Sequence, residues 1–206
     1  HGTAVAGLLA SDSTNNSLTY KFEDSYLQKL MSEKIDGVNP YLDIYSAGVL
    51  DDKNETTVDR MVAGIEWATE KNVNIINISC GLDKDSAKLH NAIIKAYANG
   101  ILIVAAAGNE GKVQYPAAYS EVMAVGSVKC NGKQAENGAT GNEIEVVAPG
   151  EDVTSYGPFG IITSQSGSSM ATPQVTALAA ILWQQDLSKS NEFIRQLIDS
   201  TARGLG

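Results

Sequence analysis

The sequence reads Gly-Ser-Ser-Met-Ala-Thr-Pro at residues 167–173 and continues into a run of small and apolar residues over 175–183. This pattern predicts a polar turn leading into a buried helix, with Gly167 allowing a tight backbone conformation. We expect Pro173 near the start of that helix, where its missing N–H removes no hydrogen bond. The Ser169 hydroxyl then lies at the first turn, where free N–H groups and the helix dipole point outward. The Ser169 hydroxyl therefore has two interpretations: it is the N-cap of the helix, or it is a nucleophile.

Two further stretches place a polar side chain beside a strand or helix end. The chain opens with His1, followed by small residues that enter a helix, and residues 105–111 read Ala-Ala-Ala-Gly-Asn-Glu-Gly. The second stretch predicts an apolar strand running into a turn at Asn109. Histidine, asparagine and serine are the base, oxyanion donor and nucleophile of acyl transfer. For Asn109 the alternative interpretation is a turn residue in the left-handed conformation.

Together the three stretches resemble the motifs of the subtilisin-like serine proteases (subtilases), in that family's order and across almost the whole chain. Residues 167–173 look like its nucleophile motif, 1–3 like its histidine motif and 107–109 like its oxyanion-asparagine motif. The resemblance implies a serine endopeptidase acting on peptides or proteins. Ser169 would attack the peptide carbonyl and His1 would carry the proton, while Asn109 and the Ser169 N–H would bind the oxyanion.

The sequence departs from the family pattern at its start. The family's aspartate lies upstream of the histidine, and no residue precedes His1 here. We therefore expect a single subtilase catalytic domain over 1–206 that lacks the N-terminal part with the Asp motif, and association with an upstream segment carrying it. The alternative is a catalytically inactive subtilase-like module that binds peptides or a partner. A flavodoxin-like module is disfavoured because no G-x-G-x-x-G or Walker pattern follows a strand.

The resemblance also implies where the substrate lies. The segment 79–81 would be the edge along which an extended peptide pairs with the backbone. A specificity pocket would lie between this segment and the end of the strand predicted over 101–106. Gln114 would form part of the pocket floor, at a position that is commonly glycine in the family. We expect it to narrow the pocket and favour a polar or acidic residue before the scissile bond. The predicted substrate-binding residues are Ser79, Cys80, Gly81, Ala106, Ala107, Gly108 and Gln114.

Hydrophobic periodicity predicts helices over 1–10, 22–33, 57–71, 85–99 and 190–201 besides the one after Ser169. Strands are expected over 41–50, 73–79, 101–106, 122–128 and 144–147, with an irregular hairpin over 152–162. Their alternation predicts right-handed βαβ units. We therefore expect a three-layer α/β fold of the subtilisin-like kind, with a mostly parallel central sheet and helices on both faces. Ligands of such sheets bind beyond the carboxyl ends of the strands, where Asn109 lies.

Composition excludes several classes of partner. The chain has 206 residues and a formal net charge of −9, which argues against nucleic acid and anionic membranes. No apolar run approaches the ~20 residues of a membrane span. From the resemblance we expect the protein to be secreted or at the bacterial cell surface.

Cysteine and histidine usage gives no metal pattern. Cys80 and Cys130 each end an apolar run, which favours buried free thiols over a disulfide, and His90 is expected to be solvated or to cap a helix. We expect no cofactor in catalysis. Structural calcium is common in the family, but no clustered carboxylate loop indicates it here.

Overall fold

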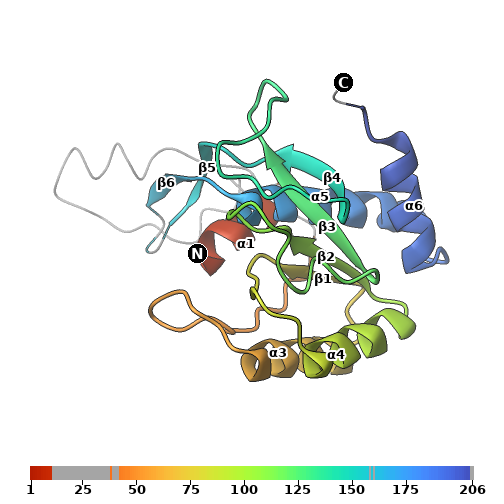
Figure 1. Ribbon diagram of the computed structural model, residues 1–206. Coiled ribbons are helices and arrows are strands. Elements are labelled where there is room, and N and C mark those ends of the chain that lie inside the picture. The colour runs from red at the N-terminus through yellow and green to blue at the C-terminus, as the bar shows by residue number, and fades with distance from the viewer. Residues whose placement is uncertain (11–37, 39–41, 158, 160, 205–206) are drawn as a thin grey trace, which may run out of the picture.

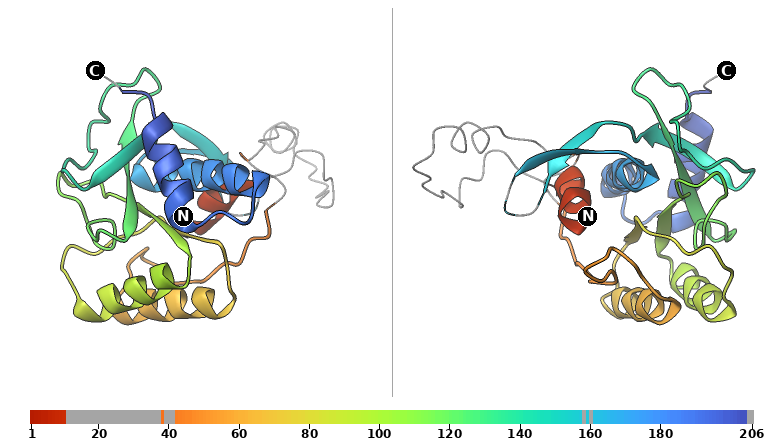
Figure 2. Two further views of the ribbon diagram at one scale, coloured as in Figure 1. Left: turned by 90° about the vertical axis from the view of Figure 1, so that its right-hand side faces the viewer. Right: turned by 60° about the vertical axis from the view of Figure 1, so that its left-hand side comes forward.

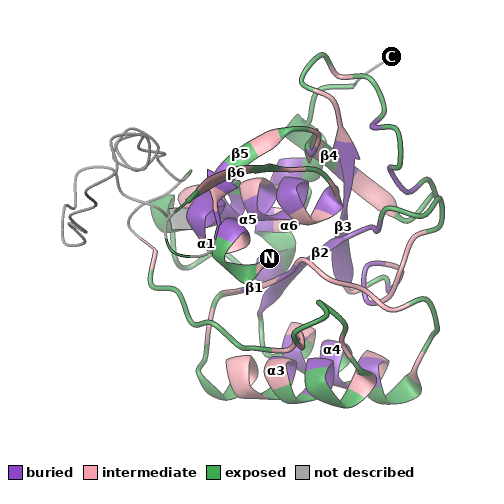
Figure 3. Ribbon diagram, turned by 90° about the vertical axis from the view of Figure 1, so that its left-hand side faces the viewer, coloured by how far each residue is buried: buried purple, intermediate pink, exposed green. Residues whose placement is uncertain are grey.

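The structure is a computed structural model that describes residues 1–10, 38, 42–157, 159 and 161–204. Its centre is a parallel sheet of four strands in the order β1-β2-β3-β4, drawn in Figure 1. The strands are β1 (Ile75–Ile78), β2 (Leu102–Ala106), β3 (Val122–Val128) and β4 (Ile144–Pro149). Residues of β2 are buried throughout, because helices cover both faces of the sheet (Figure 3).

One face is covered by α3 (Val58–Glu70) and α4 (Ala87–Ala98), which lie side by side (Figure 1). Thr57 and Ser86 cap these helices by accepting first-turn N–H groups, and Gly100 follows α4 with φ of 80°. The apolar stripes of both helices pack on the sheet. This core includes Met61, Val62, Ile65, Leu89 and Ile93 from the helices and Ile76, Ile78, Ile103, Val122 and Ala124 from the strands.

The other face is covered by α5 (Ser168–Gln185) and α6 (Asn191–Thr201), as the turned views in Figure 2 show. Ser190 caps α6 as predicted, accepting from the N–H of Phe193. The second core joins these helices to the opposite side chains of the same strands. It includes Val175, Ala179, Trp183, Ile194 and Ile198 from the helices and Leu102, Val104, Met123 and Val125 from the strands. The predicted three-layer arrangement is therefore confirmed.

The N-terminal helix α1 (Gly2–Ala10) packs on α5, with Ala4 and Leu8 against Met170. Beside it lies an antiparallel hairpin of β5 (Val153–Tyr156) and β6 (Ile162–Gln165). The hairpin is tied to α1 by the Ser155 hydroxyl, which donates to the carbonyl of Ala4 at 2.7 Å. This contact fixes the position of the helix that follows His1.

Two local predictions are wrong, and one lies outside the described residues. Residues 42–50 form no strand, because they pair with none of the described strands. Pro173 lies inside α5 rather than at its start, since the helix already begins after Gly167. Its missing N–H therefore leaves the carbonyl of Ser169 without a helical donor. The predicted helix over 22–33 lies outside the described part of the chain.

Candidate active site

The start of α5 is partly accessible to solvent, since Ser169 in its first turn is half-buried. Its N-cap is Gly167, with φ of 141° and no side-chain cap hydrogen bond, so Ser169 is not the helix N-cap. A Cβ added to Gly167 would lie 2.9 Å from Asn109 Nδ2 and 3.3 Å from Ser169 Oγ. The amide and the hydroxyl therefore both lie close to Gly167, where a larger residue would not fit.

The orientation of Asn109 follows from its hydrogen bonds. Its Oδ1 accepts from the backbone N–H of Ser168 at 2.8 Å. Because a backbone N–H can only donate, this bond assigns the oxygen and turns Nδ2 towards Gly167. The left-handed residue of this turn is Gly108, with φ of 105°, so the alternative interpretation of Asn109 as a left-handed turn residue does not hold.

Ser168 is a site residue that the sequence analysis missed. It is 1% exposed. Its hydroxyl accepts from the Gly108 N–H at 3.0 Å and donates to the Gly108 carbonyl at 3.1 Å. Ser168 thus joins the start of α5 to the turn that carries Asn109. Two adjacent serines at a helix start point in directions about 100° apart, which is the signal that could have separated their roles.

His1 lies at the start of α1. Its carbonyl accepts from the N–H of Ala4 at 3.0 Å and so opens the helix. The α1–α5 contact is made by Met170, the residue directly after Ser169, so the two helices that begin after His1 and Gly167 lie side by side (Figure 1). The His1 side chain lines a cavity that Ser79 also lines.

Gln114 lies between the two glycines predicted to flank it. Its Oε1 is 2.8 Å from the Cβ that would be built on Gly81 and equally 2.8 Å from that on Gly108. Its Nε2 donates to Asp83 Oδ1 at 2.8 Å, and since a carboxylate only accepts, the amide oxygen must face the glycines. Its backbone N–H donates to the carbonyl of Ala107 at 2.8 Å. Gln114 therefore fills the space between these strand ends.

The other residues predicted to form the pocket are Ala106, Ala107, Ser79 and Cys80. Ala106 and Ala107 are buried at the end of β2 and offer only their backbone. Ser79 and Cys80 line the cavity that contains His1. Cys80 packs beside the core, and burial raises the pKa of its thiol to about 11, so it is not a reactive thiolate.

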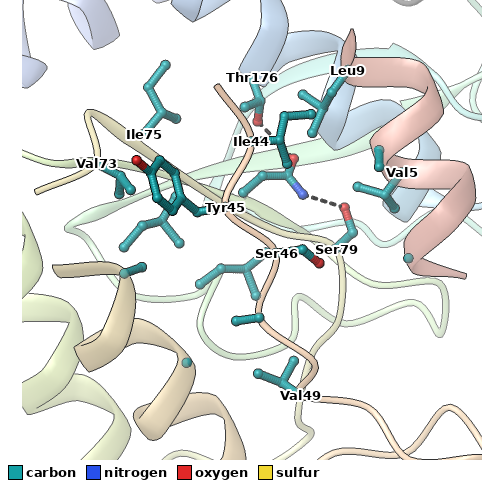
Figure 4. A pocket seen from close by; sticks show the side chains of 18 of the residues that line it. Val5, Leu9, Ile44, Tyr45, Ser46, Val49, Val73, Ile75, Ser79 and Thr176 are labelled. Carbon is teal, nitrogen blue, oxygen red and sulfur yellow. Dashed lines mark hydrogen bonds between the residues drawn. The ribbon is translucent and has the colours of Figure 1, made fainter. Parts of the chain in front are cut away.

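That cavity has a volume of about 880 Å³ and runs from α1 along residues 42–51 and β1 to the far part of α5. Figure 4 shows that Val5, Leu9, Ile44, Val49 and Ile75 surround it. Its lining is mainly apolar, with a polar group near Ser79.

In this polar group Asn77 Nδ2 donates to Ser79 Oγ at 2.9 Å and Asn77 Oδ1 accepts from Thr176 at 2.9 Å. The bonds appear as dashed lines in Figure 4. They hold the Ser79 hydroxyl in place at the end of β1.

The structure also bears on the predictions for the two cysteines, for His90 and for metal ligands. Both cysteines are free thiols, as predicted, but Cys130 is exposed. His90 is partly solvated, since its side chain is 37% exposed, and its ring also stacks on Tyr119 at 4.1 Å and bonds Glu121 at 3.0 Å. Among the residues that the structure describes, no group of His, Cys, Asp or Glu is placed to hold a metal ion. No described helix is long and apolar enough to cross a membrane.

A parallel α/β sheet, a serine and an amide donor beside Gly167, and a histidine at the start of a helix packed alongside are features of hydrolytic enzymes of the serine class. Comparison with known proteins specifies the family. The profile of the subtilase family matches residues 1–206, and the chain belongs to the subtilase family. Its relatives support the activity of a serine endopeptidase.

Among these relatives, subtilisin DY of Bacillus licheniformis is 38% identical over 213 residues, covering 100% of this chain and 71% of its own length. The thermostable alkaline protease of Halalkalibacterium halodurans is 41% identical over 208 residues, covering 100% and 53%. Among solved structures, the S41 psychrophilic protease is similar with a TM-score of 0.82 and 29% identity, covering 98% of this chain and 68% of that one. The chain thus spans between 53% and 71% of the length of these two sequence relatives.

Proposed function

We propose that this chain supplies the nucleophile, the base and the oxyanion donor of a serine endopeptidase. The observation that supports it best is the closeness of Ser169 Oγ and Asn109 Nδ2, which lie 3.3 Å and 2.9 Å from one position beside Gly167. In the reaction, Ser169 Oγ attacks the peptide carbonyl carbon while His1 takes its proton. Asn109 Nδ2 and the Ser169 N–H, a first-turn group without an intrahelical acceptor, donate to the oxyanion.

The tetrahedral intermediate then collapses. The C–N bond breaks, His1 returns the proton to the leaving amine, and an acyl ester remains on Ser169. Water, deprotonated by His1, attacks this ester, the bond between the acyl carbon and Ser169 Oγ breaks, and His1 returns the proton to Ser169 Oγ as the acid leaves. No step needs a cofactor, so we expect prolonged dialysis against a chelator to leave the rate unchanged. A fall in melting temperature on chelation would instead indicate a structural calcium ion.

We further propose that an additional extended segment, carrying the triad carboxylate, occupies the large cavity. Two features support this. One edge of β1 pairs with β2, while no described strand pairs with the other. Residues 42–50 are extended and largely exposed, and they line the same cavity as β1. A strand added there would pair its backbone with β1 and bury apolar side chains, the usual mode of β-augmentation.

The polar end of the cavity fits a carboxylate. His1 and Ser79 are polar residues of the cavity lining, together with Asn77 and Thr176. A carboxylate beside the imidazole would orient the ring and stabilise its charged form. We therefore infer that the carboxyl-terminal end of the added strand lies at Ser79.

The substrate peptide is proposed to lie in extended form past Gly81, with the side chain before the scissile bond towards Gln114. The atom presented there is the amide oxygen, an acceptor, with the Asp83 carboxylate behind it. This geometry favours short side chains or hydrogen-bond donors and disfavours the acidic residues that the sequence analysis had included.

Labelling with a fluorophosphonate tests the activity. In full-length enzyme we expect one adduct, at Ser169, and loss of labelling in Ser169→Ala. The matched control Ser200→Ala changes an exposed serine of α6 and should label as the parent does. No adduct in the full-length protein would support the inactive binding module instead.

Complementation tests the added strand. Residues 1–206 are co-expressed with the preceding segment of the full-length protein as a separate chain, in its natural form and with its aspartates changed to asparagine. We expect both forms to protect the amides of β1 from hydrogen exchange and only the natural form to restore labelling. Unchanged exchange at β1 would contradict the placement. We also propose that the full-length protein is secreted, which the fraction of protein in the culture medium would test.

A further inference from the structure

A second cavity, of about 310 Å³, shares Asn109 and Gly167 with the candidate active site. None of the residues around Gln114 lines it. Its other walls come from two loops, 135–138 after β3 and 150–152 after β4, together with Ser127 and Ser166. The turn at Gly108 and Asn109 therefore borders Gln114 at Gly108 and this cavity at Asn109.

The cavity is acidic. Glu136, Glu151 and Asp152 line it, and the cation bonded to them is Lys129. Its ammonium lies 3.4 Å from Glu136 Oε1 and 3.1 Å from Glu151 Oε1. The hydrogen bond to Glu151, followed by the electrostatic attraction, raises the pKa of Lys129 and keeps it charged. One positive charge thus faces three carboxylates, and the cavity retains negative charge.

Two buried polar atoms of this lining have no partner. They are Glu151 Oε2 and Ser127 Oγ, and Ser127 is only 5% exposed. The Ser127 hydroxyl lies 3.3 Å from the Cβ that would be built on Gly138, a residue of the cavity wall. A buried carboxylate oxygen without a donor costs about 1–3 kcal/mol or more, so the site is stabilised by a ligand that donates hydrogen bonds.

We propose that this cavity binds a lysine or arginine side chain of the substrate, on the leaving-group side of the scissile bond. The proposal rests on the proposed function, which places the residue before the bond at Gln114. A guanidinium or ammonium group carries donors for Glu151 Oε2 and Ser127 Oγ and a charge for Glu136 and Asp152. A metal ion is the competing occupant, and it is disfavoured because Lys129 already bonds two of the carboxylates.

Peptide cleavage by the full-length enzyme tests the proposal. A set of internally quenched peptides would differ only in the first or second residue after the scissile bond, which would be Lys, Arg, Ala or Glu. At one of the two positions we expect kcat/KM for Lys and Arg to exceed that for Glu by about tenfold or more. Glu151→Gln should reduce that ratio, and the exposed Glu143→Gln outside the cavity should leave it unchanged. Equal kcat/KM for all residues would overturn the proposal.

A second measurement needs no variant. The acyl-enzyme formed from an ester substrate would be offered the α-amide of arginine or of glutamic acid, each alone and preceded by glycine, and aminolysis by each would be compared with hydrolysis. At one of the two positions we expect arginine to capture the acyl group preferentially, because these amines occupy only the leaving-group side. Preference that appears only with added calcium would favour the metal ion and contradict the proposal. If Ser169 is not labelled by fluorophosphonate, the proposed function fails; normal labelling without selectivity rejects this inference alone.

Discussion

The side-chain oxygen of Asn109 accepts the backbone N–H of Ser168 at 2.8 Å, so the first N–H of α5 itself holds the Asn109 amide beside Gly167. One hydrogen bond thereby fixes three things: the first N–H of α5, the rotamer of Asn109 and the direction of Nδ2. This arrangement allows the capping and donating roles of Asn109 to be separated by substitution.

Replacing Asn109 by aspartate keeps the acceptor for Ser168 and removes the donor. We expect turnover to fall by about 10²–10³ or more, a range measured in this same family, because the new oxygen repels the oxyanion. The melting temperature should change little, since the bond to Ser168 remains. Steady-state kinetics and thermal unfolding check both expectations, and an unchanged kcat would contradict the oxyanion role.

Replacing Ser168 by alanine separates the two adjacent serines. The change leaves the buried N–H of Gly108 without its acceptor, while the Gly108 carbonyl keeps the N–H of Ala139 at 3.3 Å, so we expect unfolding to become easier by about 1–3 kcal/mol. Ser169→Ala, the matched variant, should abolish fluorophosphonate labelling with little loss of stability. Denaturant unfolding compares the two, and equal stability of Ser168→Ala and the parent would refute the positioning role.

Replacing Gln114 by alanine should open the pocket between Gly81 and Gly108. We expect kcat/KM for peptides with Phe or Leu before the scissile bond to rise by about tenfold or more, which is the size of effect that one or a few methylene groups have in a pocket. The exposed Gln134→Ala should leave kcat/KM for these peptides unchanged. A clear preference of the parent enzyme for Phe would show that Gln114 does not close the pocket.

The His90–Glu121 pair predicts a pH effect on stability. Burial alone would raise the pKa of Glu121, but hydrogen bonds from His90, the backbone and Ser120 outweigh it and hold the pKa below its ordinary value. A lowered folded-state pKa contributes stability above the unfolded value of about 4.3. That contribution is lost as pH falls through the folded pKa.

Glu121→Gln should therefore lower the unfolding free energy near pH 7, by at most about 1 kcal/mol for such a partly exposed pair. The difference from the parent should shrink below about pH 4. Urea titrations at several pH values measure it, with the exposed Glu70→Gln as control. A difference that grows in acid would contradict the assignment.

The sequence by itself determined the layers of the fold and named Ser169, Asn109 and His1 as candidate site residues, but not Ser168. Helical and strand periodicity are local properties, so β3 over Val122–Val128 was predicted to its ends. Segment 42–50 was misjudged because strand formation depends on a pairing edge, which local pattern does not contain.

Only the tertiary structure decided which groups the side chains of the candidate site contact. It placed Ser168 rather than Ser169 against Gly108, turned the oxygen of Gln114 into the pocket, and left Glu151 Oε2 and Ser127 Oγ unpaired beside Asn109. These relationships join residues far apart along the chain. They depend on hydrogen-bond partners that packing selects, and no spacing within one segment encodes them.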